Sequence, residues 1–164
     1  MSGVRHLASI HIDEDSLSSR GSEVDHERKV AMHDLLADNT FNPVGVEHGG
    51  PYALSLLERD GRLVFEIRSE DGEELAAHHL SMTPFRRLIK DYFMLCETYY
   101  DAIRAAMPEK LETIDMARRA VHNEGTELLM ARLEGKIELD FETARRLFTL
   151  ICSISMRASN RGDQ

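Results

Sequence analysis

The stretch Tyr52–Leu80, YALSLLERDGRLVFEIRSEDGEELAAHHL, decides the fold. Asp60-Gly61 and Asp71-Gly72 divide it into three runs in which apolar and polar residues alternate. Such alternation is typical of strands, and Asp-Gly between two runs favours a type I′ turn, in which both central residues have positive φ. We therefore predict an antiparallel meander of three strands, Tyr52–Glu58, Arg62–Arg68 and Glu74–Leu80. Its inward-facing side chains are predicted to be Tyr52, Leu54, Leu56, Leu63, Phe65 and Ile67.

The residues before the meander predict one strand and one helix. The segment Val4–Ile12 alternates in the manner of a strand, and the inward side chains of this strand are predicted to be Val4, His6, Ala8, Ile10 and Ile12. A polar loop, Asp13–Gly21, follows. Ser22 is a suitable N-cap for a helix that continues to Ala37, and Asn39–Pro51 is expected to be irregular.

After the meander the apolar period becomes helical. Thr83 as N-cap and Pro84 at the first helical position predict a helix that ends near Ala106. We expect this helix to cover one face of the meander. Its apolar stripe is predicted to consist of Phe85, Leu88, Ile89, Tyr92, Leu95, Cys96, Tyr99 and Ile103.

Two further helices are predicted in the last third of the chain. Pro108 begins the first of them, which Gly125 either interrupts or ends, with Thr126 capping a continuation to Leu133. The short segment Lys136–Leu139 is compatible with an extra edge strand. Asp140 is expected to cap the last helix. The apolar face of that helix is predicted to carry Phe141, Ala144, Leu147, Phe148 and Ile151.

Together these elements predict an α+β fold. An antiparallel β-meander with an N-terminal strand and helix packs against a C-terminal group of three helices. A chain of 164 residues fits one domain, 1–164, and can bury a core without metal or disulfide support. Within it, 1–21 form the N-terminal strand and polar loop, and 155–164 form a flexible tail. The two cysteines, Cys96 and Cys152, are expected to be reduced and packed in the core.

The charge pattern and the terminal sequence restrict the class of protein. Residues 1–82 hold 7 Lys and Arg against 16 Asp and Glu, whereas residues 83–164 hold 13 of each kind. The net charge of −9 argues against general nucleic-acid binding, which needs a cationic surface. No run approaches the ~20 apolar residues of a membrane span, and the first residues lack the apolar core of a signal peptide. The prediction is a cytoplasmic protein without membrane contact.

Arg118 is the most informative candidate for a functional site. Projected at roughly 100° per residue, it lies on the same arc as the apolar residues Leu111, Ile114, Val121 and Leu128. An arginine is rarely buried without a partner, because an unpaired charge is costly to remove from water. Arg118 is therefore expected either to meet a carboxylate from another element or to line a polar cleft with His122 and Glu124.

Other arginines add to this candidate site. Arg28 projects among apolar residues of the first helix, and two inward arginines on separate helices would suit a phosphate or a carboxylate; two structural salt bridges are the other interpretation. Three doublets, Arg86-Arg87, Arg118-Arg119 and Arg145-Arg146, each lie on a helix, where a solvated surface is the simpler interpretation. The predicted ligand-binding residues are Arg28, Arg87, Arg118 and His122, with His122 and Glu124 as candidates for acid–base catalysis.

No motif indicates a metal or a cofactor. His26-Glu27 begins like the zinc-protease motif, but Val30 occupies the position of the second histidine. His78 and His79 are adjacent on a predicted strand, so their rings point to opposite faces. We therefore predict no metal site and no cofactor.

Several long motifs resemble a known family. They are Asp25-His26-Glu27-Arg28, Thr83–Phe93, His122-Asn123-Glu124-Gly125, Gly135-Lys136-Ile137 with Asp140, and Thr143–Leu150. The family consists of uncharacterised bacterial proteins of alphaproteobacterial type, and the resemblance covers most of the chain. It implies a bacterial cytoplasmic protein and supplies no catalytic residues.

Two hypotheses for the function follow. The first is a non-enzymatic binding or regulatory module that self-associates or meets a protein partner through its helical half. It rests on the charge asymmetry and on helical residues that exceed the needs of a core, namely Tyr92, Phe93, Met94, Tyr99 and Tyr100. The second is an enzyme or sensor for a small phosphorylated or carboxylated ligand held by the arginine and histidine cluster.

Overall fold

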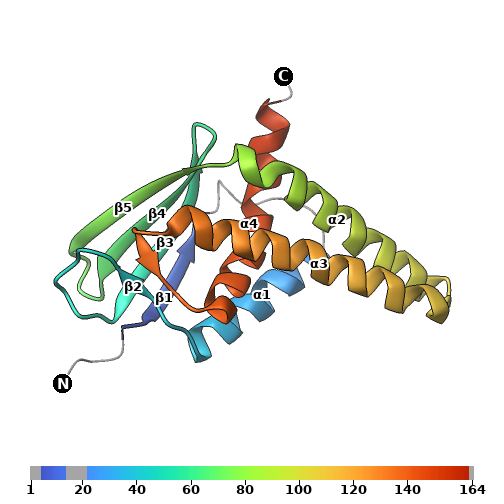
Figure 1. Cartoon of the computed structure of the whole chain (residues 1–164), viewed down its shortest axis with the longest axis horizontal. Coiled ribbons are helices and arrows are strands. Elements are labelled where there is room, and N and C mark those ends of the chain that lie inside the picture. The colour runs from blue at the N-terminus through green and yellow to red at the C-terminus, as the bar shows by residue number, and fades with distance from the viewer. Residues whose placement is uncertain (1–4, 14–21, 163–164) are drawn as a thin grey trace.

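The computed structural model describes residues 5–13 and 22–162, and the side chains of residues 22–24 and 155–162 are not described. The predicted start of the first strand and most of the predicted polar loop lie outside these residues. A four-stranded sheet with the order β1-β3-β4-β5 forms one side of the molecule, and four helices form the other (Figure 1). The predicted α+β class is therefore confirmed.

The predicted meander is present. Strands β3 (Tyr52–Arg59), β4 (Arg62–Ser69) and β5 (Glu74–Ser81) pair antiparallel, and all six side chains predicted to face inward are buried. Asp60 and Gly61 both have positive φ, 56° and 78°, as a type I′ turn requires. In the second turn only Gly72 has positive φ, and its amide donates to the carbonyl of Ser69. The type I′ prediction is therefore wrong for that turn, which is longer.

Strand β1 (Leu7–Ile12) extends the meander at its other edge, parallel to β3. Parallel neighbours need a crossover connection, which contains α1 (Ser22–Ala37). The predicted inward set of β1 is right at Ile12, which is buried, and wrong at the start of the strand, where Leu7 is buried and Ala8 is exposed. The register shifts between Leu7 and Ser9, which reverses the facing of the residues before it. Asn39 holds this end of the strand, since its side chain bonds both the amide and the carbonyl of Leu7.

A second sheet has two strands, one in the segment predicted to be irregular and one in the segment predicted to be an extra edge strand. Strand β2 (Asn42–Pro43) pairs antiparallel with β6 (Ile137–Glu138). The predicted edge strand Lys136–Leu139 therefore exists in shortened form, but it belongs to this small sheet and not to the edge of the main sheet.

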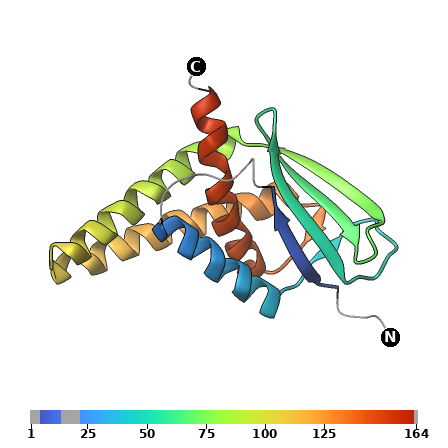
Figure 2. The ribbon, with the colours of Figure 1, turned by 180° about the vertical axis from the view of Figure 1, so that it is seen from behind.

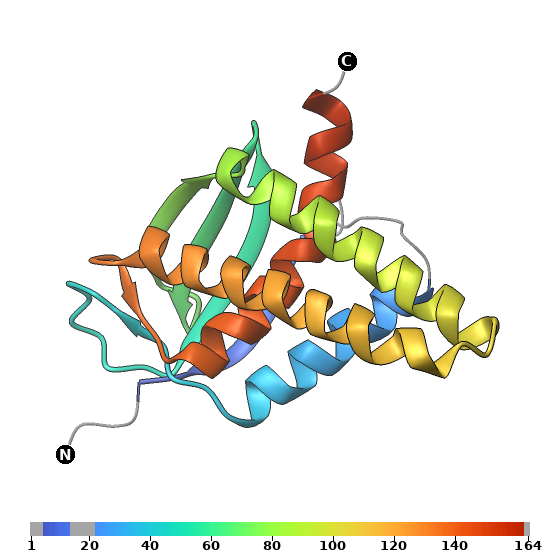
Figure 3. The ribbon, with the colours of Figure 1, turned by 45° about the vertical axis from the view of Figure 1, so that its right-hand side comes forward.

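Helices α2 (Thr83–Arg104) and α3 (Pro108–Leu133) form an antiparallel hairpin that projects from the body (Figures 1 and 3). The predicted N-cap is wrong by one residue, because Met82 occupies the cap position and Thr83 is the first helical residue. Ile103 was predicted in the apolar stripe, yet it is exposed, because this end of α2 lies near the tip of the hairpin. Phe93, absent from the predicted stripe, is buried.

Helix α3 is continuous through Gly125, so the glycine neither interrupts nor ends it. A Cβ atom at this position would lie 2.1 Å from Cζ of Phe148 on α4 (Phe141–Gly162). The glycine therefore allows close approach of two helices. Thr126 does not cap a new helix, because its hydroxyl donates to the carbonyl of His122 one turn earlier.

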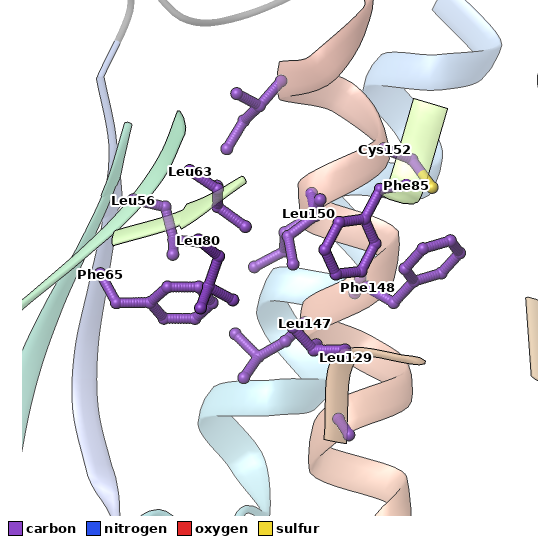
Figure 4. Close-up of a cluster of buried hydrophobic side chains, with 14 of the residues drawn as sticks. Leu56, Leu63, Phe65, Leu80, Phe85, Leu129, Leu147, Phe148, Leu150 and Cys152 are labelled. Carbon is purple, nitrogen blue, oxygen red and sulfur yellow. The ribbon is translucent and has the colours of Figure 1, made fainter. Parts of the chain in front are cut away.

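The helix that faces the sheet is α4, and the prediction that the helix after Thr83 covers the meander is wrong. Figure 4 shows Leu147 and Leu150 of α4 opposite sheet residues that include Leu56, Leu63 and Phe65. Seen from behind, α1 lies beside α4 and β1 (Figure 2). Helix α2 packs mainly against α3. An apolar stripe on α2 predicts that this face is buried, but it does not predict whether the sheet or another helix covers it.

The ends of α4 differ in their agreement with the sequence. Asp140 caps the helix as predicted, because its Oδ1 accepts from the amide of Thr143 at 2.9 Å. Phe141, predicted on the apolar face, is exposed. The backbone is helical through Gly162, and the flexibility predicted for 155–164 stays a prediction.

Candidate functional site

Four helices converge around a polar cleft on the helical side of the molecule. Its volume is about 350 Å³. Residues from all four helices line it, namely Glu27, Tyr92, Asp115, Arg118, Arg119, His122, Asn123, Arg145 and Thr149. A cleft built from facing helices is a common position for a ligand in helical proteins.

Arg118 lies in this cleft with its side chain about four-fifths buried. Its Nη2 is 3.0 Å from Oδ1 of Asp115, one turn earlier on α3, and its Cζ is 4.4 Å from the centroid of the Tyr99 ring. Stacking on an aromatic face is favourable for a guanidinium group. The carboxylate partner thus comes from the same helix. This ion pair therefore does not support the interpretation in which a carboxylate from another element holds Arg118.

The arc predicted for α3 is displaced from the buried face. Leu111, Ile114, Val121 and Leu128 are half-buried, whereas the fully buried positions are His122, Gly125, Thr126, Leu129 and Leu133. The first half of α3 belongs to the projecting hairpin, and α2 is its principal neighbour. Arg118 therefore lies at the border between the projecting part and the body, and its guanidinium reaches the cleft.

Two more guanidinium groups complete the positive side of the cleft. Arg119 pairs with the other oxygen of Asp115 at 2.9 Å, and Arg145 contacts Glu142 at 3.2 Å through Nε and Nη2. The lining contains three arginines and two carboxylates, Glu27 and Asp115. With His122 neutral, the lining therefore carries one net positive charge, which favours an anion.

His122 is the buried polar residue of the cleft. Its Nε2 lies 2.7 Å from Oγ1 of Thr149, and its ring packs edge-on against Phe148. Burial lowers its pKa to about 4, and the positive charges of Arg145 and Arg118 add to this effect. The imidazole is therefore neutral at physiological pH.

One nitrogen of this imidazole lacks a partner. The Thr149 hydroxyl donates to the carbonyl of Arg145, so its oxygen can accept from the Nε2 proton of His122. Nδ1 is then an acceptor, and among the described residues it is buried without a hydrogen-bond partner. A buried polar atom without a partner is costly and marks a place where a ligand or a water completes the structure.

A hydrogen bond between two helices forms the inner wall of the cleft. The Tyr92 hydroxyl donates to Oε1 of Glu27 at 3.1 Å, which joins α2 to α1. Burial raises the pKa of Tyr92 far above its ordinary value, with smaller contributions from Cys96, Cys152 and Glu27. Tyr92 therefore stays protonated and acts as a neutral donor.

The structure brings together two of the predicted site residues, Arg118 and His122. Arg28 is elsewhere engaged, because its Nη1 is 3.0 Å from Asp25 on its own helix. Arg87 is exposed and bridges Asp91 and Glu124, with 3.3 Å to the latter. Neither Arg28 nor Arg87 lines the cleft, and Glu124 also lies outside it. The proposed catalytic pair of His122 and Glu124 is thus not assembled.

Sequence reasoning missed Arg119, Arg145, Tyr92, Thr149 and Glu27 as members of the site. The doublets containing Arg119 and Arg145 were visible, yet a doublet on a helix is usually solvated, so spacing alone gives no reason to select them. Tyr92 fell in an apolar stripe and was considered for the core and for a partner surface, but not for a polar cleft. These residues come together in the cleft only because four helices pack around it, and the sequence does not show that packing.

These features define an α+β protein with a sheet on one side and a cationic cleft between the helices on the other. The model of Uncharacterised protein family (UPF0262) matches residues 4–157, and the chain belongs to this family. It is 55% identical over 152 residues to the UPF0262 protein of Hyphomonas neptunium, with 93% of each chain covered. It is 54% identical to a UPF0262 protein of Brucella canis, covering 92% of this chain and 94% of the relative. A third relative, from Xanthobacter autotrophicus, is 51% identical with 90% of each chain covered.

The resemblance noted in the sequence is therefore confirmed. No solved structure gives a significant match. Within residues 5–13 and 22–162, none of the helices is both long enough and apolar enough to span a bilayer.

Proposed function

We propose that this protein binds a small phosphorylated or carboxylated anion in the cleft between its helices. The observation that carries the proposal is the convergence of Arg118, Arg119 and Arg145 around the buried His122. Guanidinium groups donate hydrogen bonds in a planar, forked geometry that matches carboxylate and phosphate oxygens.

The roles of the side chains follow from their positions. Arg118, held in place by Asp115 and by the Tyr99 ring, would contact the anion directly. His122, neutral and hydrogen-bonded to Thr149, would form an uncharged part of the wall beside the anion. We propose binding and not a reaction, because Glu124 pairs with Arg87 and offers His122 no acid–base partner.

A thermal-shift experiment tests this function. Inorganic phosphate, pyrophosphate and citrate at millimolar concentration are expected to raise the melting temperature, because a ligand that binds only the folded state stabilises it by RT ln(1 + [L]/Kd), about 2.7 kcal/mol at a concentration 100-fold above Kd. The double variant Arg118→Met, Arg145→Met is expected to lose the shift. A wild-type protein whose melting temperature does not respond to these anions would refute the proposal.

A second function, contact with a protein partner, is favoured by a separate observation. Met94, Ile103 and Met116 are large apolar residues with 55%, 47% and 63% of their surface exposed, and all three lie on the projecting α2–α3 hairpin. Exposed apolar residues on a projecting element suit a partner protein or a second copy of this chain. Tyr92 and Phe93, which the sequence suggested for such contacts, are buried and belong to the core. Light scattering of the wild type and of Met94→Ser, Met116→Ser distinguishes a self-associating hairpin from a free one.

We also propose a cytoplasmic location. Cys96 and Cys152 are both free and buried, as expected in a reducing compartment. Protease treatment of intact cells and of permeabilised cells, with detection of the labelled protein in each, tests this location.

A further inference from the structure

A second cavity adjoins the cationic cleft. It has a volume of about 170 Å³ and lies between α2 and α4. Glu27, Tyr92 and Thr149 line both cavities, so the Tyr92–Glu27 hydrogen bond lies at their common wall. The two spaces therefore lie next to each other around the same three side chains.

One part of the wall of this second cavity is apolar and uncharged. Phe93, Tyr100, Cys96 and Cys152 contribute to it. Burial raises the pKa of both thiols, which therefore remain neutral. Neutral thiols behave as small apolar groups, so this part of the wall offers an anion little stabilisation.

Charged residues of the same cavity make it still less suitable for an anion. Glu97, Asp101 and Glu27 supply three carboxylates, and Arg104 supplies one guanidinium that pairs with Asp101. The adjoining cleft has the opposite balance, with three guanidinium groups and two carboxylates. A ligand that reaches both spaces is therefore expected to place its anionic group in the cleft and an apolar group against Phe93, Tyr100 and the two thiols.

From the apolar part of this wall and its position beside the cationic cleft, and on the basis of the anion-binding function above, we propose that the ligand is amphipathic. Its carboxylate or phosphate binds at Arg118 and Arg145, and an apolar group about the size of a phenyl ring occupies the neighbouring cavity. The size follows from the volume, because a protein cavity of about 150 Å³ lined by apolar side chains accommodates benzene. The ligand class is thus an aryl or short-alkyl carboxylate or phosphate monoester.

Isothermal titration calorimetry with matched probes tests the proposal. Phenyl phosphate is expected to bind the wild-type protein at least tenfold more tightly than inorganic phosphate, and benzoate at least tenfold more tightly than acetate. Methyl phosphate, whose apolar group is small, is expected to lie between phosphate and phenyl phosphate. Equal affinities for phenyl phosphate and inorganic phosphate would overturn the amphipathic ligand while leaving the anion-binding function intact. No measurable binding of any probe would overturn both.

A pair of substitutions places the ring. Cys152→Met fills part of the cavity from a residue outside the cationic cleft and is expected to reduce the preference for phenyl phosphate to threefold or less. Cys152→Ala enlarges the same space and is expected to keep the preference at tenfold or more. Circular dichroism confirms that each variant is folded, and the probe series on the wild type decides the question if Cys152→Met does not fold. A tenfold preference that survives in folded Cys152→Met would show that the ring binds elsewhere and would overturn the proposal.

Discussion

Gly125 of α3 and Phe148 of α4 are in such close contact that a Cβ atom on the glycine would lie 2.1 Å from Cζ of the ring. One residue beyond Phe148 is Thr149, and three residues before Gly125 is His122, the pair joined by the 2.7 Å hydrogen bond in the cleft. The contact therefore fixes the separation of the two helices at the point where the candidate site is formed. A missing side chain at position 125 is what allows His122 and Thr149 to meet.

Gly125→Ala is expected to destabilise the protein by about 1–3 kcal/mol. Overpacking a tight contact costs roughly this amount, and it outweighs the gain in helix propensity of about 1 kcal/mol. Urea unfolding measures the change. Glu127→Ala, an exposed position on the same helix, is the matched control and should change stability little. Adding Phe148→Leu to Gly125→Ala should be less costly than the sum of the two single changes, and strict additivity would contradict a direct contact.

Arg118→Met is expected to separate binding from stability. Asp115 retains Arg119 as a partner, so the substitution leaves no unpaired carboxylate and removes one ion pair within a helix, and stability should fall by no more than about 1 kcal/mol. Binding of phosphate should weaken at least tenfold, as measured by calorimetry. Arg132→Met, on the exposed side of the same helix, should bind phosphate as the wild type does. A loss of several kcal/mol would instead assign Arg118 a structural role.

The stability of the protein is expected to fall as the pH decreases from about 6.5 towards 4. The folded state holds His122 neutral with a pKa of about 4, whereas its ordinary value is 6.5. Between these values the unfolded chain binds more protons at this residue, and acidification therefore favours unfolding. The effect amounts to about 2 kcal/mol between pH 6.5 and 5. Urea unfolding across this range should show a shallower pH dependence in His122→Gln, and identical slopes would contradict the assignment.

Asp140→Ala is expected to cost about 1 kcal/mol, the usual value for loss of an N-cap. Its carboxylate accepts a hydrogen bond from the Thr143 amide, which loses this partner in the variant. The backbone amide of residue 140 donates to the hydroxyl of Thr40, and the substitution leaves that bond in place. Asp140→Asn should retain most of the stability, since asparagine caps helices equally well. Thermal unfolding of the two variants provides the comparison, and equal losses would show that capping is not the cause.

The parts of the fold that could be predicted are those with a local signal. Alternation and Asp60-Gly61 define the meander, and Asp140 defines the start of α4, because turns and caps depend on residues that are close in sequence. The parallel pairing of β1 with β3 and the pairing of β2 with β6 join distant segments and leave no such signal. The helix that covers the sheet was misassigned for the same reason, since an apolar stripe shows that a face is buried and not what buries it.

The sequence indicated only those residues of the candidate site whose polarity differs from that of their neighbours on the same helix face. Arg118 and His122 were noticed because polar groups near an apolar stripe need partners. Arg145 belongs to an arginine doublet of the kind that is usually solvated, and Tyr92 lies in an apolar stripe. The sequence around each residue therefore gives no sign of a site. Arg28 was noticed by the same reasoning as Arg118 and also pairs with an aspartate one turn earlier, Asp25, but it does not line the cleft. A local anomaly thus identifies a candidate, and only the packing distinguishes a ligand site from an ion pair.

The parallel pairing of β1 with β3 also has a consequence for the order of assembly. Hairpins β3–β4 and β4–β5 join strands that are neighbours in the chain, whereas Leu7 must meet Tyr52 across the whole of α1. Closing that long loop costs more conformational entropy than closing a hairpin, so local pairs are expected to form first. Among the strands of this sheet, the one that is synthesised first would then be the last to join. Pulse-labelled hydrogen exchange during refolding should find the amide of Asp13, which donates to the carbonyl of Leu56 on β3, protected later than those of Leu54 and Phe65.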